Sequence, residues 1–506
     1  MAAVLSFDFG TGGVRAGVYS SDGRAMLSIE DVSYETIFPR TGWAEQDPKA
    51  WLEGMIAAGR AAIKSAGITD IEAVCVATTA STTVACTAAG APMRPAILWM
   101  DCRASDEARM TANVSHPVMS YSGGSDAVEW LVPKAMWLSR HENHNYVGAD
   151  VICEALDFIN FHLTGEWVGS RMNAACKWNY DSLNGRFVPE IYDELGVPDL
   201  IDKLPPRIVP VGGVIAPMSA RMVEALGLTF TPMVAQGGID AHIGMLGAGT
   251  VAAGGMLIIG GTSVVQLTQL TGPENVDGFW GPYPNALVDD HWLVEAGQVS
   301  AGSILDWLVG DIFGLDREGH IVLMQEVADC PGRAEGLLAL DFWMGNRTPY
   351  RDGQLRGAIM GLSLGHGRAD IYAALVDAIA LGTANVLAVL GERGVGIDRI
   401  VLAGGICKNP VWLKATIDAI GRPVTVVRDG NLSLLGAAVC SLTALGVFPD
   451  LIAASAACAV GDLEIEPDVQ RSAWYQGTLG LYRDATDSLT PTLHALSVRQ
   501  NGGAAQ

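Results

Sequence analysis

Residues 7–23 read FDFGTGGVRAGVYSSDG, and this stretch guides the interpretation of the rest of the chain. An apolar segment runs into Asp8, three glycines follow within the turn 10–13, and a second apolar segment begins after Arg15. Glycines have no Cβ and let backbone N–H groups approach a phosphate, and Thr11 adds a hydroxyl donor. A carboxylate at a strand end supplies the hard oxygen that Mg²⁺ prefers. The stretch therefore predicts a phosphate-binding turn with Asp8 beside a metal ion.

Two other interpretations of this turn remain open. It can be a tight hairpin turn without a ligand. It can also belong to a Rossmann-type dinucleotide site, in which the turn leads into a helix. Residues 16–21, AGVYSS, continue as a strand, which disfavours the Rossmann interpretation.

A second stretch, MLIIGGTSVVQLTQLTG at 256–272, repeats the order of strand, small-residue turn and strand. The chain has 506 residues, which is long enough for two domains. We therefore expect an N-terminal domain over 1–250 and a C-terminal domain over 251–506, each offering a glycine-rich turn to a shared cleft. The boundary should fall near GAGTVAAG, residues 247–254.

Short apolar segments alternate with helical stretches through most of the sequence. This alternation is typical of an α/β fold. We expect helices over residues 48–67 and 369–394. We expect strands in the segments VLSFDFG, AGVYSS, AVCVATT, PMVAQGGID, MLIIGGTS, DRIVLAGG and PVTVV.

A third glycine turn lies in LAGGICKNP, residues 402–410, between the predicted strand DRIV and a predicted helix. Gly404 and Gly405 would let a purine lie flat against the backbone. A simple strand-to-helix bend is an equally good interpretation of these residues.

Asp240 lies in QGGIDAH, residues 236–242, directly after an apolar strand. An aspartate at that place can cap a helix. It can also act as a general base that takes a proton from a hydroxyl attacking a phosphoryl group. Lys177 and the segment 295–298, EAGQ, are polar groups among apolar neighbours, and they can bind a polyol or face solvent.

Composition excludes several classes of protein. The net charge of −23 and the absence of Lys/Arg clusters argue against nucleic acid as a partner. Nine cysteines without a CxxC pair argue for a reducing, cytoplasmic location rather than a disulfide framework or a zinc site. We also expect no transmembrane helix, no signal peptide and no membrane partner.

The order of these segments resembles that of the FGGY carbohydrate kinases. The resemblance runs from about residue 4 to about 445 and rests on DFGTGGVR, GWAEQDPKAW, LWMDCRA, DFINFHLTGEW, GGIDAH, GGTS, LRGAIMGLSLGH, AIALGTANV and LAGGICKN. It implies two ribonuclease H-like domains of the actin/hexokinase ATPase type that flank an active-site cleft. It also implies transfer of the γ-phosphoryl group of ATP to a sugar or polyol hydroxyl, with Mg²⁺, and a homodimer is possible.

The resemblance also implies roles for single residues. Asp8 would be the metal-associated carboxylate and Asp240 the catalytic base. The ATP-binding residues would be Gly10, Thr11, Gly12 and Gly13 in the first turn, Gly261, Thr262 and Ser263 in the second, and Gly404, Gly405 and Asn409 in the third. Most family members carry Ser or Thr near position 13, where this chain has glycine.

Other motifs favour one branch of the family. Glycerol kinases carry an Arg-Glu pair and xylulokinases a Met-His pair in the stretch corresponding to 79–82, TAST, which has neither. The segments EAGQ, GNRTP, CKW and EW before PK resemble the ribulokinase branch, so ribulose or ribitol is the expected substrate. The sugar-binding residues would then be Lys177, Glu295, Ser81 and Gln298. Xylulose or erythritol kinases, an actin-like ATPase without transfer, and a dinucleotide-dependent oxidoreductase are the alternatives.

Overall fold

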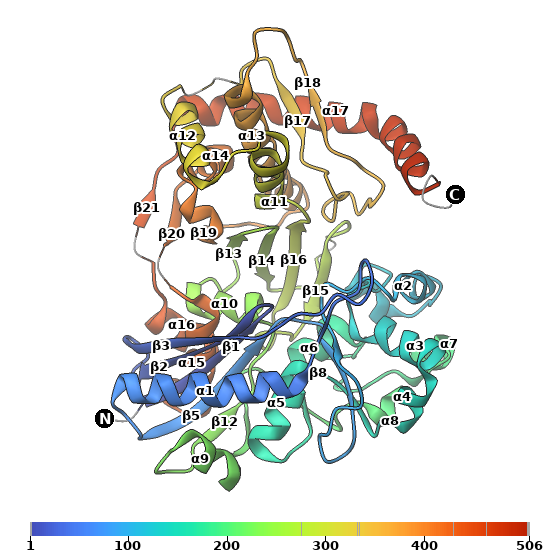
Figure 1. Cartoon of the computed structure of the whole chain (residues 1–506), viewed down its shortest axis with the longest axis vertical. Coiled ribbons are helices and arrows are strands. Elements are labelled where there is room, and N and C mark those ends of the chain that lie inside the picture. The colour runs from blue at the N-terminus through green and yellow to red at the C-terminus, as the bar shows by residue number, and fades with distance from the viewer. Residues whose placement is uncertain are drawn as a thin grey trace.

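The computed structural model describes residues 3–502 apart from 275, 331, 333, 429 and 462. Figure 1 shows two lobes, each built on one twisted β-sheet. The N-terminal sheet has the strand order β11 (Val214–Pro217), β12 (Met233–Ala235), β5 (Ile71–Thr78), β1 (Ala3–Gly10), β2 (Gly13–Ser20) and β3 (Met26–Ser33). The C-terminal sheet has the order β15 (Trp280–Pro284), β16 (Trp292–Gln298), β14 (Val264–Leu270), β13 (Gly255–Gly260), β19 (Arg399–Gly404), β20 (Val424–Val427) and β21 (Leu463–Ile465).

The two sheets repeat one pairing scheme. In the first, β1 pairs antiparallel with β2, β2 antiparallel with β3, and β1 parallel with β5. In the second, β13 pairs antiparallel with β14, β14 antiparallel with β16, and β13 parallel with β19. The echo between the segments at 7–23 and 256–272 thus corresponds to equivalent hairpins of two similar sheets, and the α/β expectation is confirmed.

Helices form three layers around these sheets. The outer face of the N-terminal sheet is covered by α1 (Pro48–Ala66), α5 (Ala155–Thr164) and α9 (Ala220–Leu226). The outer face of the C-terminal sheet is covered by α13 (Arg368–Glu392) and α14 (Pro410–Ile420), and α17 (Val469–Gly502) packs on these two helices. Between the sheets lie α10 (Asp240–Ala248), α15 (Leu432–Ala444) and α16 (Leu451–Cys458), which share one apolar core with the inner faces of both sheets.

The helix α15 follows β20 in sequence but packs on the N-terminal sheet. A Cβ built on Gly17 of β2 would lie 3.2 Å from Leu434 Cδ1. Leu434 and its neighbours share a core cluster with Val4 and Ala73. Part of the range expected for the C-terminal domain, 251–506, therefore packs against the N-terminal lobe, which brings distant segments into one central layer.

A four-stranded sheet extends the N-terminal lobe, with the order β4 (Glu45–Gln46), β7 (Ala96–Ile97), β6 (Thr83–Cys86) and β8 (Val151–Glu154). Beside it lie α2 (Ser105–Thr111), η1 (Pro117–Ser122), α3 (Leu131–His141), α4 (Asn143–Gly148), α6 (Arg171–Lys177), α7 (Pro189–Glu194), α8 (Leu200–Lys203) and the pair β9 (Val168–Ser170) and β10 (Arg207–Val209). The C-terminal lobe adds α11 (Gly302–Asp306), η2 (Trp307–Ile312), α12 (Arg317–Ala328), η3 (Gly405–Lys408) and the pair β17 (Leu338–Leu340) and β18 (Ala358–Met360).

Helix α13 is long and apolar enough to span a membrane by length and composition, although the sequence suggested no such segment. Most of its apolar window, 83%, is buried inside the C-terminal lobe. Burial of this kind is typical of the core helix of a globular domain.

Candidate active site

The first glycine turn joins β1 to β2 and is held by side chains of the N-terminal lobe. Gly10 pairs directly with Gly13 across the hairpin. Gln46 donates its amide N–H to the Thr11 carbonyl at 2.7 Å, and Trp99 donates its indole N–H to the Thr11 hydroxyl at 3.0 Å. The turn is therefore fixed before any ligand binds.

Gly13 must be glycine in this arrangement. A Cβ at this position would lie 2.6 Å from the carbonyl oxygen of Val32 in β3 and 3.0 Å from Ser33 Cα. Because both are backbone atoms, a side chain would require β3 to move. Gly13 stands where most family members carry Ser or Thr, and the close approach of β2 and β3 leaves no room for such a side chain.

The second and third turns lie side by side at the ends of β13 and β19. Gly260 and Gly404 are partners in the parallel ladder. Gly404 has a φ of +92°, and a Cβ there would lie 2.6 Å from the Gly260 carbonyl. The start of α11 closes on the second turn, where Gly302 N–H donates to Gly261 O at 3.0 Å. Glycine is required here both by the positive φ and by the close backbone.

Thr262 is exposed and Ser263 is half-buried in the second turn. Asn409 ends the third turn and is the N-cap of α14. Its Oδ1 accepts from Trp412 N–H at 3.1 Å, and its Nδ2 donates to the Tyr372 hydroxyl at 2.9 Å. The side chain of Asn409 therefore holds the start of α14 against α13.

Asp8 is buried and is the first of two carboxylates at the central layer. On β1, Leu5 and Phe7 pack in the outer core, so Asp8 with the opposite parity faces α15. Its Oδ2 accepts from Asn431 Nδ2 at 2.9 Å and from Arg15 at 3.3 Å. Burial raises the pKa of Asp8, although Asn431 and Arg15 oppose the shift.

Asp240 is the second carboxylate and is the first residue of α10. The N-cap position belongs to Ile239, and Asp240 Oδ1 accepts from the N–H of Ala241 at 2.7 Å. Burial and the nearby carboxylates of Asp8 and Glu295 raise the pKa of Asp240 to about 7. A carboxylate with such a pKa can accept a proton near neutral pH.

Lys177, at the end of α6, forms a buried ion pair with Glu295 on β16. Lys177 Nζ lies 3.1 Å from Glu295 Oε2 and 4.7 Å from the centroid of the Trp130 ring. Burial opposes the charge of Glu295, but Lys177 and His242 outweigh it and hold the pKa of Glu295 well below its usual range. Burial likewise opposes the charge of Lys177, and Glu295 outweighs it, so the pKa of Lys177 is raised.

Sequence reasoning missed three neighbours of this pair. His242 on α10 lies with Nε2 3.4 Å from Glu295 Oε2. The rings of Trp280 and Tyr283 on β15 lie 5.7 and 6.0 Å from Lys177 Nζ. His242 stands in the same GGIDAH segment as Asp240 and could have been found there, whereas nothing in the sequence links the aromatic rings to Lys177.

Ser81 lies deeper, in a network that joins two loops to α6. Its hydroxyl donates to Glu154 Oε1 at 2.7 Å, which also accepts from Trp178 Nε1 at 2.7 Å. The fully buried Lys134 donates to the carbonyls of Ser81 and Leu98 at 2.7 and 2.6 Å. Burial lowers the pKa of Lys134 to about 7. Trp178 directly follows Lys177, so this network also fixes the chain next to the Lys177–Glu295 ion pair.

Gln298 does not join the cluster. It lies three residues after Glu295 on β16, and the odd spacing places it on the opposite face of the sheet. Its Nε2 donates to Asp341 Oδ2 at 2.8 Å, and its Oε1 accepts from Thr383 at 2.7 Å. The amide of Gln298 is thus used inside the outer core of the C-terminal lobe.

Comparisons with known proteins agree with this geometry. The N-terminal domain of the FGGY family of carbohydrate kinases matches residues 3–247, and its C-terminal domain matches residues 256–445. The chain belongs to the FGGY family of carbohydrate kinases. It is therefore an ATP-dependent sugar kinase, and its two lobes have the actin/hexokinase-like fold. This membership replaces the oxidoreductase interpretation.

Named relatives of this FGGY kinase include several sugar kinases. An FGGY carbohydrate kinase domain-containing protein of Xenopus laevis is 30% identical over 410 residues, which is 72% of each chain. A ribulokinase of Anoxybacillus flavithermus is 28% identical over 484 residues, covering 88% of this chain and 86% of the relative. The crystal structure of a xylulose kinase from Rhodospirillum rubrum matches with a TM-score of 0.86 and 26% identity, covering 97% of this chain and all of that one.

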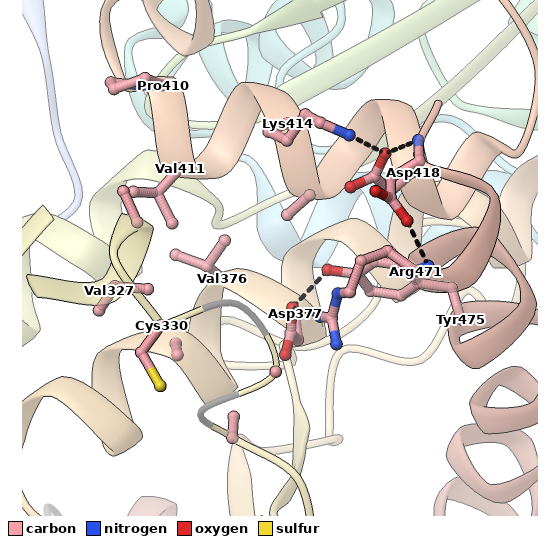
Figure 2. A pocket seen from close by; sticks show the side chains of 16 residues that line it. Val327, Cys330, Val376, Asp377, Pro410, Val411, Lys414, Asp418, Arg471 and Tyr475 are labelled. Atoms are coloured by element: carbon pink, nitrogen blue, oxygen red, sulfur yellow. Dashed lines mark hydrogen bonds and ion pairs between the residues drawn. The ribbon is translucent and has the colours of Figure 1, made fainter. Parts of the chain in front are cut away.

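A separate cavity of about 280 Å³ lies in this kinase between α12, α13, α14 and α17 (Figure 2). Its charged side chains pair with one another. Asp377 accepts from Arg471 at 3.3 Å and from the Tyr475 hydroxyl, and Asp418 pairs with Lys414. These contacts dock α17 on α13 and α14, and none of the residues that line the cavity belongs to the Asp8, Asp240 or Glu295 clusters.

Proposed function

We propose that this FGGY kinase phosphorylates a pentulose such as ribulose, or the related pentitol ribitol, with Asp240 as general base. The observation that carries the proposal is the buried Lys177–Glu295 pair next to Asp240. The similarity to the ribulokinase of Anoxybacillus flavithermus supports the same substrate class.

The Lys177–Glu295 pair suits a polyhydroxylated ligand. Lysine offers three hydrogen-bond donors and a carboxylate offers only acceptors. The pair can therefore donate to some sugar hydroxyls and accept from others. The rings of Trp130 and Trp280 offer apolar faces to the C–H groups of a sugar. Ser81 borders this site from behind, through Glu154 and Trp178. We leave Gln298 out of the proposed site because its amide bonds within the opposite core.

Asp240 would take the proton of the attacking hydroxyl. A positioned base of this kind contributes about 10²–10⁴ in rate. A pKa of about 7 leaves a large fraction of Asp240 ionised at neutral pH. A carboxylate with this pKa accepts the proton of a hydroxyl group more readily than an aspartate with an ordinary pKa of about 4.

The three glycine turns would hold ATP. The close backbone contacts at residues 13 and 404 require glycine. Because glycine has no Cβ, the N–H groups of these turns stay open to phosphate oxygens. The proposed contacts come from Gly10, Thr11, Gly12, Gly13, Gly261, Thr262, Ser263, Gly404 and Gly405. Asn409 would act by holding the start of α14.

The residues present also fit Mg²⁺. Among the described residues no group of three or more His, Cys, Asp or Glu side chains is arranged to hold a metal ion. Mg²⁺ in phosphoryl-transfer sites needs only one or two carboxylates besides phosphates and water. Asp8 would hold the ion directly or through water, and the ion would neutralise charge on the phosphates.

An ADP-release assay tests this function. Mg²⁺-ATP is supplied with D- and L-ribulose, D- and L-xylulose, ribitol, xylitol, arabitol, erythritol and glycerol. We expect one strong response among the ribuloses or ribitol. A response to xylulose or erythritol alone would contradict ribulose and ribitol as substrates but keep the kinase. A measurable ATPase that no sugar or polyol stimulates would favour the actin-like alternative.

Xylulose is the second candidate substrate, because the xylulose kinase of Rhodospirillum rubrum shares 26% identity and nearly the full length. The stretch 79–82, TAST, argues against it, since the Met-His pair of xylulokinases is missing. We also propose that the protein is cytoplasmic and that its domain boundary lies near residue 250. We further propose that it forms a homodimer. Limited proteolysis and light scattering would test the last two.

A further inference from the structure

The first turn of α15 contacts both Asp8 and Asp240, which lie 423 and 193 positions away from their partners in sequence. Asn431 Nδ2 donates to Asp8 Oδ2 at 2.9 Å across 423 positions of sequence. Two residues later, Ser433 Oγ donates to the carbonyl oxygen of Asp240 at 3.0 Å. One helix start therefore contacts the side chain of Asp8 and the backbone of Asp240.

Asn431 is held firmly enough to orient a partner. It is the N-cap of α15, and its Oδ1 accepts from Leu434 N–H at 2.8 Å. The helix behind it is wedged in the central layer, because a Cβ on Gly247 of α10 would lie 2.5 Å from the carbonyl of Leu432. With Oδ1 fixed by the helix, the amide Nδ2 can point in only one direction.

The hydrogen bond from Asn431 makes the two carboxylate oxygens of Asp8 different. Oδ2 accepts from Asn431 and Arg15, whereas no described residue donates a hydrogen bond to Oδ1. The Arg15 side chain is 55% exposed, so water competes for its bond, while Asp8 is almost fully buried. Asn431 is thus the ordered donor that sets the rotation of the carboxylate.

We propose that Asn431 is a positioning residue that presents Asp8 Oδ1 to the Mg²⁺ ion bound with the nucleotide phosphates, directly or through water. The inference rests on the metal role of Asp8 in the proposed function. Asn431 itself touches neither ligand: it acts by turning Asp8, and the same helix turn fixes the spacing to Asp240 through Ser433. A local sequence motif does not reveal this role, because the partner lies 423 positions away in sequence.

Asn431→Ser separates this role from helix capping. Serine caps a helix about as well as asparagine, so Tm should stay within about 2 °C of wild type. The shorter hydroxyl cannot reach Asp8. Asp450→Ser is the matched control, since Asp450 caps the neighbouring α16 by accepting from Ala453 N–H and contacts no residue of the site.

Isothermal titration calorimetry with ATP, in Mg²⁺ and in EDTA, measures the effect. We expect Asn431→Ser to weaken ATP binding about tenfold in Mg²⁺ and to leave it unchanged in EDTA, while Asp450→Ser changes neither. In an Asp8→Asn background the substitution should have no further effect, because both act through one carboxylate.

Equal weakening with and without Mg²⁺, no weakening at all, or an additive effect in the Asp8→Asn background would each overturn the inference. Failure of the proposed function is distinguishable. If wild-type ATP affinity does not depend on Mg²⁺, or Asp8→Asn leaves that dependence intact, then the metal role of Asp8 is wrong and the role of Asn431 falls with it.

Discussion

At the two ends of the candidate site, the pKa of a carboxyl group is shifted in opposite directions. At one end, burial and the carboxylates of Asp8 and Glu295 raise the pKa of Asp240 to about 7. At the other end, Lys177 and His242 outweigh burial and hold the pKa of Glu295 well below its usual range. Burial opposes the charge of both groups, so burial alone does not explain the opposite shifts.

The difference lies in the neighbours. The carboxylates of Asp8 and Glu295 add to burial in favouring the neutral form of Asp240, whereas Glu295 is paired with a lysine that favours its ionised form. A group that binds and releases a proton near neutral pH suits a general base. A permanently charged carboxylate suits a fixed hydrogen-bond acceptor. The comparison predicts different consequences when each carboxylate is neutralised.

Removing the proton acceptor should have the largest effect. Asp240→Asn should lower kcat by about 10²–10⁴, because the amide cannot take the hydroxyl proton. Thermal stability at pH 8 should not fall, since the substitution removes a charge that the site disfavours. Steady-state kinetics and differential scanning calorimetry measure both. Asp377→Asn, at a half-buried carboxyl outside the site whose pKa burial also raises to about 6, is the control and should keep kcat. An unchanged kcat in Asp240→Asn would refute the base.

Neutralising the fixed carboxylate should affect binding more than the chemical step. Glu295→Gln should raise the sugar KM about 10–100-fold, as expected for loss of a charge-assisted hydrogen bond. It should also cost about 3 kcal/mol of unfolding free energy, because Lys177 is left buried without a counter-charge. The double variant Lys177→Met/Glu295→Gln should recover stability in denaturant titrations but not the KM. A KM that recovers with stability would contradict direct contact with the sugar.

The pH profile tests the raised pKa directly. Asp240 must be ionised to act as a base, so kcat/KM should rise with pH toward a plateau, with its midpoint at about 7. At one pH unit below the midpoint, the value should be about tenfold under the plateau. A midpoint near 4, the ordinary value for an aspartate, would show that Asp240 is not the group that titrates.

The smallest effect on activity should come from the opposite face of the same strand. Gln298→Met should leave the sugar KM within about twofold of wild type, because the amide bonds to Asp341 and Thr383 rather than to the site. It should lower the unfolding free energy by about 1–3 kcal/mol through the unpaired groups left behind. A tenfold rise in KM at unchanged stability would return Gln298 to the sugar site.

Much of the fold follows from local sequence pattern. The glycine turns and the alternation of apolar residues predict the hairpins β1–β2 and β13–β14, and their echo indicates two similar lobes. Turn geometry depends on residues a few positions apart, so it can be deduced from a short segment. Strand parity could also have shown that Glu295 and Gln298 face opposite ways, which the motif alone concealed.

What the sequence by itself determined is the set of candidate groups: the three turns and the side chains of Asp8, Asp240, Lys177 and Glu295. What only the tertiary structure decided is which of them meet and what charge each carries. Lys177 and Glu295 pair across 118 positions, and Asn431 reaches Asp8 across 423. Such contacts exist only after two sheets and the helices between them have packed, and pKa values depend on those neighbours and on burial. The chemistry of each carboxylate is therefore a property of the central layer of the fold.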